Sequence, residues 1–363
     1  MTRLQRLLEA ARSRGANAVA VVSGTNLRYL TGLQYHAGER LTLAVFGTDG
    51  RCGFVLPEME AERTQKASAI PMAIYSWNDA QSPQAAMDRL VAEMSLGGQA
   101  IAVEHGAMRV FELLALQRAG VGETPDATPM FFELRMVKEE PELATMKRAV
   151  QMIERSLDAL LGKIRPGLTE RQVASMWLAE VLNQGAEGPA FDFIVASGPN
   201  AASPHHGTAD RLLQIGDLVI LDGGARHDGY NSDITRTIAI GQPSEVARRV
   251  YDVVLAANTA AREAAKPGMS GRDLDAVARK VIEDAGFGPQ FMHRTGHGLG
   301  MDVHEAPNIA TYNTEVLPVG SVFTIEPGVY LAGQTGVRIE DDVLLSESGG
   351  VSLTNYPREL IVI

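Results

Sequence analysis

The sequence contains a single cysteine, Cys52, among 363 residues. One cysteine can form neither an intrachain disulfide nor a cage of thiolate metal ligands, so both kinds of site are excluded. No apolar run approaches the roughly 18 residues that a membrane-spanning helix needs. The first 15 residues form a charged amphipathic segment that lacks the apolar stretch of a secretory signal. We therefore expect a cytoplasmic protein that binds no membrane.

Basic side chains are also in deficit, with 33 lysines and arginines against 44 aspartates and glutamates, which gives a net charge of −11. A chain of this charge has no general attraction for phosphate backbones, so nucleic acid is not an expected partner. The hydrophobic content of 45% and the charged content of 21% are ordinary for a globular protein. The length suggests about two domains, each able to bury its own core.

Residues 1–131 alternate short apolar runs with helical patterns, which predicts a compact α/β domain. Gly, Thr, Asp and Pro cluster over 123–129, where we expect this domain to end, so that a second domain covers 132–363. No cluster of titratable side chains stands out in the first domain. We therefore expect it to serve as a scaffold or as a dimer contact.

The second domain contains an internal repeat. Two long helical patterns each end in a Pro-Gly pair, and the two pairs lie 101 residues apart (267 − 166). A second helix is expected after each pair. Farther along, the apolar run Leu218–Leu221 precedes Asp222, and Val322–Ile325 precedes Glu326, at an offset of 104 residues (326 − 222).

Each repeat supplies a second acid after a glycine-containing turn, Asp233 in one copy and Glu340 in the other. Two related α-α-β-hairpin units, packed about a pseudo-twofold axis, would bring the four carboxylates together. Such carboxylates repel one another and need arginine partners, protons or metal ions. His297, between Gly296 and Gly298, is the candidate nitrogen ligand, and one imidazole with four carboxylates suits a pair of Mn-, Co- or Zn-like ions. The glycines are expected to let the backbone approach the site and to keep its mouth open.

These motifs resemble those of the pita-bread metallopeptidases over roughly residues 132–363. The residues that carry the resemblance are, in chain order, Asp222-Gly223-Gly224, Gly229-Tyr230-Asn231-Ser232-Asp233-Ile234-Thr235-Arg236-Thr237, Gly296-His297-Gly298-Leu299-Gly300, Val303-His304-Glu305, Ile325-Glu326-Pro327-Gly328 and Val337-Arg338-Ile339-Glu340-Asp341. Near the N-terminus, residues 26–32 are similar to a motif of the creatinase-type N-terminal domain, which indicates the prolidase and aminopeptidase P branch. The resemblance implies an α+β protein, in which a pita-bread domain over 132–363 follows a smaller creatinase-like α/β domain over 1–131.

The resemblance also implies the metal ligands and the assembly. Asp222 would chelate one metal ion. His297 and Glu326 would chelate the other, and Asp233 and Glu340 would bridge both. Mn is the expected metal, with Co and Zn as alternatives, and a homodimer is expected. Two such ions activate water and polarise the carbonyl of a scissile peptide bond.

The catalytic residues implied by the resemblance are Glu326, His205, His304 and Arg338. Glu326 would take up a proton and pass it to the leaving proline nitrogen. That nitrogen has no hydrogen in an Xaa-Pro bond, so a dedicated site is needed. His205 and His304 would hydrogen-bond the substrate. Arg338, on the same strand face as Glu340, would neutralise excess carboxylate charge.

The expected substrates are proline-containing peptides. A dipeptidase must bind the free carboxylate of the proline, best with a bidentate arginine. Some prolidases that resemble this chain carry an arginine shortly after the Val-His-Glu motif, where this sequence has Asn308. Because Asn308 has no charge, we expect an Xaa-Pro aminopeptidase that prefers longer peptides, with a prolidase acting on Xaa-Pro dipeptides as the alternative. Arg294, or another loop arginine, could reach into the site and supply the charge instead.

Other classes of function remain as competing hypotheses. His293 and His297 have the spacing of a zincin helix, but the glutamate of that motif is absent and the neighbouring glycines oppose a helix. A pita-bread protein that had lost its metals would be a binding module. The same site could also serve a lyase, or a hydrolase of non-peptide substrates. A metal titration separates the binding module from the enzymes.

Overall fold

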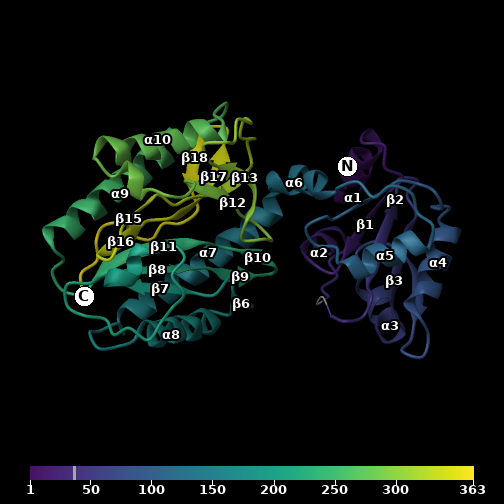
Figure 1. Cartoon of the computed structure of the whole chain (residues 1–363), viewed down its shortest axis with the longest axis horizontal. Coiled ribbons are helices and arrows are strands. Elements are labelled where there is room, and N and C mark those ends of the chain that lie inside the picture. The colour runs from purple at the N-terminus through teal and green to yellow at the C-terminus, as the bar shows by residue number, and fades with distance from the viewer. Residues whose placement is uncertain (36–37) are drawn as a thin grey trace. The chain divides into compact units, whose positions relative to one another are not determined.

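The computed structural model describes residues 1–35 and 38–363 and divides into two compact units, Met1–Leu134 and Arg135–Ile363 (Figure 1). The division falls three residues after the boundary expected at 131 (134 − 131). None of the helices in the described part of the chain is long and apolar enough to cross a membrane.

The first unit is built around one five-stranded sheet with the order β4-β3-β2-β1-β5. Its strands are β1 (Ala18–Val22), β2 (Leu43–Gly47), β3 (Cys52–Pro57), β4 (Ala73–Trp77) and β5 (Ile101–Val103). Its helices are α1 (Arg3–Ser13), α2 (Thr25–Thr31), α3 (Glu58–Ala67), α4 (Pro83–Glu93) and α5 (Val110–Arg118), and α6 (Thr128–Met136) follows them. The central strands β1 and β2 are buried along their whole length, which is why short apolar runs reveal them.

The second unit contains two helix pairs at the positions expected from the repeat. The first pair is α7 (Glu140–Leu161) and α8 (Glu170–Asn183), and the second is α9 (Glu245–Ala264) and α10 (Gly271–Asp284). Reciprocal capping bonds begin both second helices, between Thr169 and Gln172 in α8 and between Ser270 and Asp273 in α10. Short 3-10 helices lie at η1 (Gly198–Ala202) and η2 (Gly288–Gln290).

The strands of the second unit repeat in the same order. They are β6 (Gly188–Pro189), β7 (Ile194–Ser197), β8 (Leu218–Gly223), β9 (Ala225–His227), β10 (Tyr230–Asn231), β11 (Ile234–Ala239), β12 (Gly296–Gly298), β13 (Glu305–Ile309), β14 (Val322–Ile325), β15 (Gly328–Leu331), β16 (Thr335–Arg338), β17 (Asp341–Ser346) and β18 (Gly349–Ser352). The antiparallel array β7-β8-β11 of the first repeat corresponds to β12-β14-β17 of the second. A small hairpin follows the middle strand in each copy, β9–β10 and β15–β16. The repeat expected from the sequence is therefore present in the fold.

Hydrogen bonds join the two repeats where β11 meets the end of β16 and the segment after it. The amide of Glu340 donates to the carbonyl of Thr235 at 3.0 Å. The Thr237 hydroxyl donates to the carbonyl of Arg338 at 2.8 Å and accepts from its amide at 3.2 Å. In Figure 1, α9 and α10 lie on one side of the strands of this unit and α8 lies on the other. The join between the repeats therefore lies between helical layers, where polar side chains are shielded from solvent.

Candidate metal centre

The five residues expected as metal ligands lie on the strands of the two repeats or beside them, and they are called the candidate ligands below. They are Asp222 in β8, Asp233 directly before β11, His297 in the middle of β12, Glu326 directly after β14, and Glu340 between β16 and β17. Glu340, expected on a returning strand, lies instead in the break between two strands. All five line one cavity of 560 Å³. The fold thus brings together every residue that the sequence assigned to the metals.

The candidate ligands approach one another at ligand-like separations. His297 Nε2 lies 3.3 Å from Glu326 Oε1 and 3.9 Å from Asp233 Oδ2. One atom each of Asp233, His297 and Glu340 lies within 4.8 Å of the others. The imidazole is oriented, because its Nδ1 donates to the carbonyl of Gly298 at 3.1 Å and leaves the Nε2 lone pair facing the acids.

Burial and crowding give these groups unusual proton affinities. Burial, and then the neighbouring carboxylates, raise the pKa of Asp233 and Glu340 well above the ordinary range. The same causes raise the pKa of Glu326 to about 7, against the opposing charge of Arg338. Burial lowers the pKa of His297 to about 3, so its imidazole is neutral at physiological pH. A neutral imidazole is the form that binds a metal ion.

The donor set fits divalent metal ions. Asp222 Oδ1 and Asp233 Oδ1 are buried, and neither has a hydrogen-bond partner in the described part of the chain. A buried acceptor without a donor destabilises a fold, and a cation between these oxygens would satisfy both. Four carboxylates and one imidazole are typical donors for Mn-, Co- or Zn-like ions.

Arg338 partly balances the acids from inside the cavity wall. Its Nη2 donates to Asp222 Oδ2 at 2.6 Å, and its Nε donates to the Thr235 hydroxyl at 3.2 Å. That hydroxyl in turn donates to Glu340 Oε2 at 2.6 Å. The arginine, expected beside Glu340, therefore pairs directly with Asp222 and reaches Glu340 through Thr235.

His205 and His304 line the same cavity, with both side chains partly open to solvent. The ring of His304 packs edge-on against His297, with 4.2 Å between the ring centroids. Partial burial, and then the cation of Arg294, lower the pKa of His304. Both histidines thus stand where a bound substrate would meet them.

Glu170, at the start of α8, anchors the segment that carries His205. This fully buried carboxylate accepts hydrogen bonds from the Ser197 amide at 2.7 Å and from the Ala209 amide at 3.1 Å. His206 Nε2 lies 3.2 Å from Glu170 Oε2, the oxygen that also accepts from the Ala209 amide. The two ends of the loop are therefore tied to one side chain. Sequence reasoning missed this role, although the acid stands in the capping motif of α8.

Tyr330 and His293, whose roles sequence reasoning also missed, form a hydrogen-bonded chain with Arg338. Arg338 Nη1 donates to the Tyr330 hydroxyl at 2.9 Å, and that hydroxyl lies 2.9 Å from His293 Nε2. His293 Nδ1 donates to the carbonyl of Arg294 at 2.7 Å, so Nε2 accepts from Tyr330. Burial lowers the pKa of His293 to about 4, which keeps it neutral. The signal in the sequence was His293 four residues before His297, which we considered only as a zincin pattern.

The glycines beside His297 let neighbouring backbone approach closely, as expected. A Cβ on Gly296 would lie 1.8 Å from the carbonyl oxygen of Thr324 in β14. A Cβ on Gly298 would lie 2.2 Å from that of Ala306 in β13. Gly296 and Gly298 therefore let two strands close on β12 from both sides, which fixes His297 in place.

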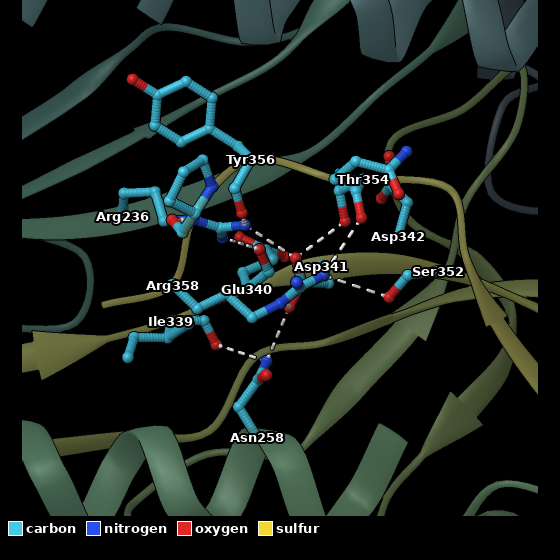
Figure 2. Close-up of polar contacts among 12 residues, drawn as sticks. Arg236, Asn258, Ile339, Glu340, Asp341, Asp342, Ser352, Thr354, Tyr356 and Arg358 are labelled. Atoms are coloured by element: carbon cyan, nitrogen blue, oxygen red, sulfur yellow. Dashed lines mark hydrogen bonds and ion pairs between the residues drawn. The ribbon is translucent and has the colours of Figure 1, made fainter. Parts of the chain in front are cut away.

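Asp341, next to Glu340, forms the centre of a buried ion network (Figure 2). Its carboxylate accepts from Arg236 at 2.8 Å, from Arg358 at 2.7 Å and from Asn258 at 3.1 Å. Arg236 also donates to the backbone carbonyl of Glu340 at 2.6 Å. The cations lower the pKa of Asp341 despite its burial. The network holds the backbone of Glu340 from the side away from the cavity.

Comparison with known protein families agrees with this geometry. The family model described as "Metallopeptidase family M24" matches residues 144–347. The model described as "Creatinase/Prolidase N-terminal domain" matches residues 3–137. The Xaa-Pro dipeptidase of Pyrococcus horikoshii is 34% identical over 359 residues, which cover 99% of this chain and 98% of that relative.

Solved structures give the same result. A dipeptidase from Pyrococcus horikoshii OT3 has a TM-score of 0.95 and 37% identity, and 100% of both chains is covered. An X-Pro aminopeptidase from Thermotoga maritima MSB8 has a TM-score of 0.88 and 31% identity, again with 100% of both chains covered. The α+β fold expected from the sequence is confirmed, and the chain belongs to metallopeptidase family M24, with a creatinase-type N-terminal domain before its pita-bread domain.

Proposed function

We propose that this metallo-exopeptidase is an Xaa-Pro dipeptidase, which hydrolyses dipeptides that have proline in the second position. The observation that carries the proposal is the convergence of the five candidate ligands on one small cavity, in a chain whose full-length relative is named an Xaa-Pro dipeptidase. The cavity of 560 Å³ suits a short peptide better than a polypeptide segment.

This proposal replaces the expectation of an aminopeptidase that prefers longer peptides. That expectation depended on the neutral side chain of Asn308, which left no counterion for the carboxylate of a dipeptide. Arg294 lines the same cavity and contacts Asn308, so a cation is present beside the candidate ligands. The relatives named dipeptidases also exceed the X-Pro aminopeptidase in identity and in structural similarity. The physical reason for preferring longer peptides is therefore lost.

The candidate ligands would hold two metal ions. We propose that Asp222 binds one ion, that His297 and Glu326 bind the other, and that Asp233 and Glu340 contact both. When bound, such a pair lowers the pKa of water and polarises the scissile carbonyl. Mn suits the carboxylate-rich donor set, and Co and Zn are the alternatives.

The remaining groups of the cavity would bind the substrate and move its protons. Glu326 would accept a proton from the attacking water and return it to the proline nitrogen, which has no hydrogen in the Xaa-Pro bond. His205 and His304 would hydrogen-bond the substrate from the open side. The apolar side chains that line the cavity would contact the proline ring and the preceding side chain; they are Phe191, Ile194 and Val303.

The test compares hydrolysis of Ala-Pro, Ala-Pro-Ala and Ala-Ala by the Mn-loaded protein, with chelator-treated protein as the control. We expect kcat/KM to be highest for Ala-Pro and activity to disappear with the metal. A tenfold preference for Ala-Pro-Ala would instead assign the chain to the Xaa-Pro aminopeptidases. Absence of hydrolysis from protein that has bound two metal ions would refute a peptidase function.

A further inference from the structure

Arg294 lies in a cavity crowded with carboxylates but forms an ion pair with none of those in the described part of the chain. It lies two residues before β12, is half-buried, and lines the cavity of the candidate ligands. Its Nη1 donates to Asn308 Oδ1 at 2.6 Å, and among residues 1–35 and 38–363 no carboxylate lies within ion-pair distance of it. Arg338, the other arginine of the cavity wall, is engaged by Asp222. The charge of Arg294 is therefore available to a ligand.

The position of Asn308 explains why this guanidinium faces the site. Asn308 lies in β13 and pairs directly with His297 of β12. Directly opposed residues of antiparallel strands place their side chains on the same face of the sheet. An amide oxygen accepts a hydrogen bond but carries no charge, so it orients the guanidinium without neutralising it. The arginine and its amide partner thus lie on the face that carries the histidine ligand.

We propose that Arg294, oriented by Asn308, binds the C-terminal carboxylate of the Xaa-Pro dipeptide and makes the enzyme selective for dipeptides. This inference rests on the proposed function and names the group that recognises its substrate. In a dipeptide the free carboxylate belongs to the residue that follows the scissile bond, so it must enter the acid-rich cavity with the reacting carbonyl. Repulsion by the acids opposes that entry, and the paired N–H donors of a guanidinium counter it.

The test separates the carboxylate from the rest of the substrate. Ala-Pro and Ala-Pro amide differ only at that group, and both are assayed with the Mn-loaded wild type and the Arg294→Gln variant. We expect kcat/KM for Ala-Pro to fall about 10²-fold in the variant, the scale of a lost pair of charge-assisted hydrogen bonds. The fall for the amide should be much smaller, because the amide has no carboxylate for Arg294 to bind. Arg248→Gln, which removes an exposed arginine paired with Asp252 on α9, is the matched control and should alter neither value.

Rescue and direct binding provide two further measurements. Because the Asn308 side chain contacts the guanidinium, an arginine at position 308 would place a cation in nearly the same location. We therefore expect Asn308→Arg to restore part of the preference for Ala-Pro in the Arg294→Gln background. Calorimetry should show that wild type binds N-acetylproline more tightly than N-acetylprolinamide, and that Arg294→Gln loses this difference at unchanged metal content.

Equal losses on Ala-Pro and its amide would overturn the inference, because Arg294 would then support the site or the reacting centre rather than the carboxylate. Unchanged hydrolysis of both substrates by Arg294→Gln would overturn it as well. Failure of the proposed function has a different signature. In that case the wild type itself would cleave Ala-Pro-Ala and not Ala-Pro, whatever residue occupies position 294.

Discussion

Among single residues, the buried acids and the buried histidines of the cavity respond to pH in opposite directions. Folding raises the pKa of Asp233 and Glu340, and that of Glu326 to about 7, so these acids hold protons in the folded state that they lose when unfolded. Their contribution to stability falls as pH rises through these values. Folding lowers the pKa of His293 to about 4 and that of His297 to about 3. The stability that these two histidines contribute therefore increases with pH only up to about 6.5, the pKa of histidine in the unfolded chain.

We therefore predict that the metal-free protein loses stability as the pH rises above about 6.5, where the histidines no longer contribute and only the acids still titrate. Bound metal ions supply the missing positive charge, so the metal-loaded protein should not show this loss. Thermal unfolding of both forms, followed by circular dichroism across that range, measures the difference. A metal-free Tm that rises with pH over the same interval would contradict the prediction.

His304 tests the separation between metal binding and catalysis. His304→Ala should retain two metal ions per chain and lower kcat by about 10²- to 10⁴-fold, the usual effect of removing a positioned proton or hydrogen-bond donor. Metal analysis and steady-state kinetics on the same sample measure both quantities, and His105→Ala, in the first unit, is the control. Loss of metal together with activity would instead make His304 a ligand or a structural support.

At the scale of the elements, the second helix of each repeat carries a buried acid that holds an active-site segment. Glu170 of α8 holds the loop of His205. Asp275 of α10 accepts from the amide of Thr295 at 3.0 Å and from its hydroxyl at 2.8 Å, in the segment that leads to His297. Each helix pair therefore positions a segment that lines the candidate centre as well as covering the sheet.

We predict that Glu170→Gln lowers kcat by about 10- to 10²-fold without changing the metal content, because small displacements of an active-site group are costly. The effect should vanish in a His205→Ala background, since the anchor then has no catalytic side chain to position. Glu180→Gln on the same helix, where Glu180 pairs with Lys163, is the matched control. Equal losses in both backgrounds would assign Glu170 to general stability.

Local patterns predicted the elements whose signal lies in one contiguous stretch. An apolar run followed by an acid marks β8 with Asp222 and β14 with Glu326, and a capping motif marks the start of α8. In the first unit α3 has a single buried side chain and β4 is only half-buried, so neither shows a clear pattern. These two elements, like α2 and α6, were not predicted from the sequence.

Contacts between distant segments were beyond such reasoning. The order of residues does not reveal that Asn308 pairs with His297, so the place of Arg294 stayed open until the strands were aligned. The anchoring role of Glu170 and the network around Asp341 are tertiary contacts of the same kind. The homodimer and the cytoplasmic location stay predictions.

At the scale of the whole molecule, Asp341 links the two repeats through a buried ion pair with Arg236 of β11. Asp341→Asn would leave Arg236, which is 2% exposed, short of its counter-charge. We predict that this change lowers the free energy of unfolding by about 3–5 kcal/mol. Asp252→Asn, which breaks an exposed pair on α9, should cost about 0.5 kcal/mol or less. Denaturant unfolding of both variants measures the difference, and a cost below about 1 kcal/mol for Asp341→Asn would contradict it.

The division of the candidate ligands between two repeats also sets the order in which the centre can appear during biosynthesis. Glu340 follows Asp222 by 118 residues (340 − 222). At a translation rate of about 5–20 residues per second, the first carboxylates leave the ribosome about 6 to 24 seconds before the last. Until residue 297 is made, the nascent chain carries two acids of the centre, Asp222 and Asp233, and neither the imidazole of His297 nor the guanidinium of Arg338. We therefore expect the complete centre to bind its metal ions only after the second repeat has been synthesised.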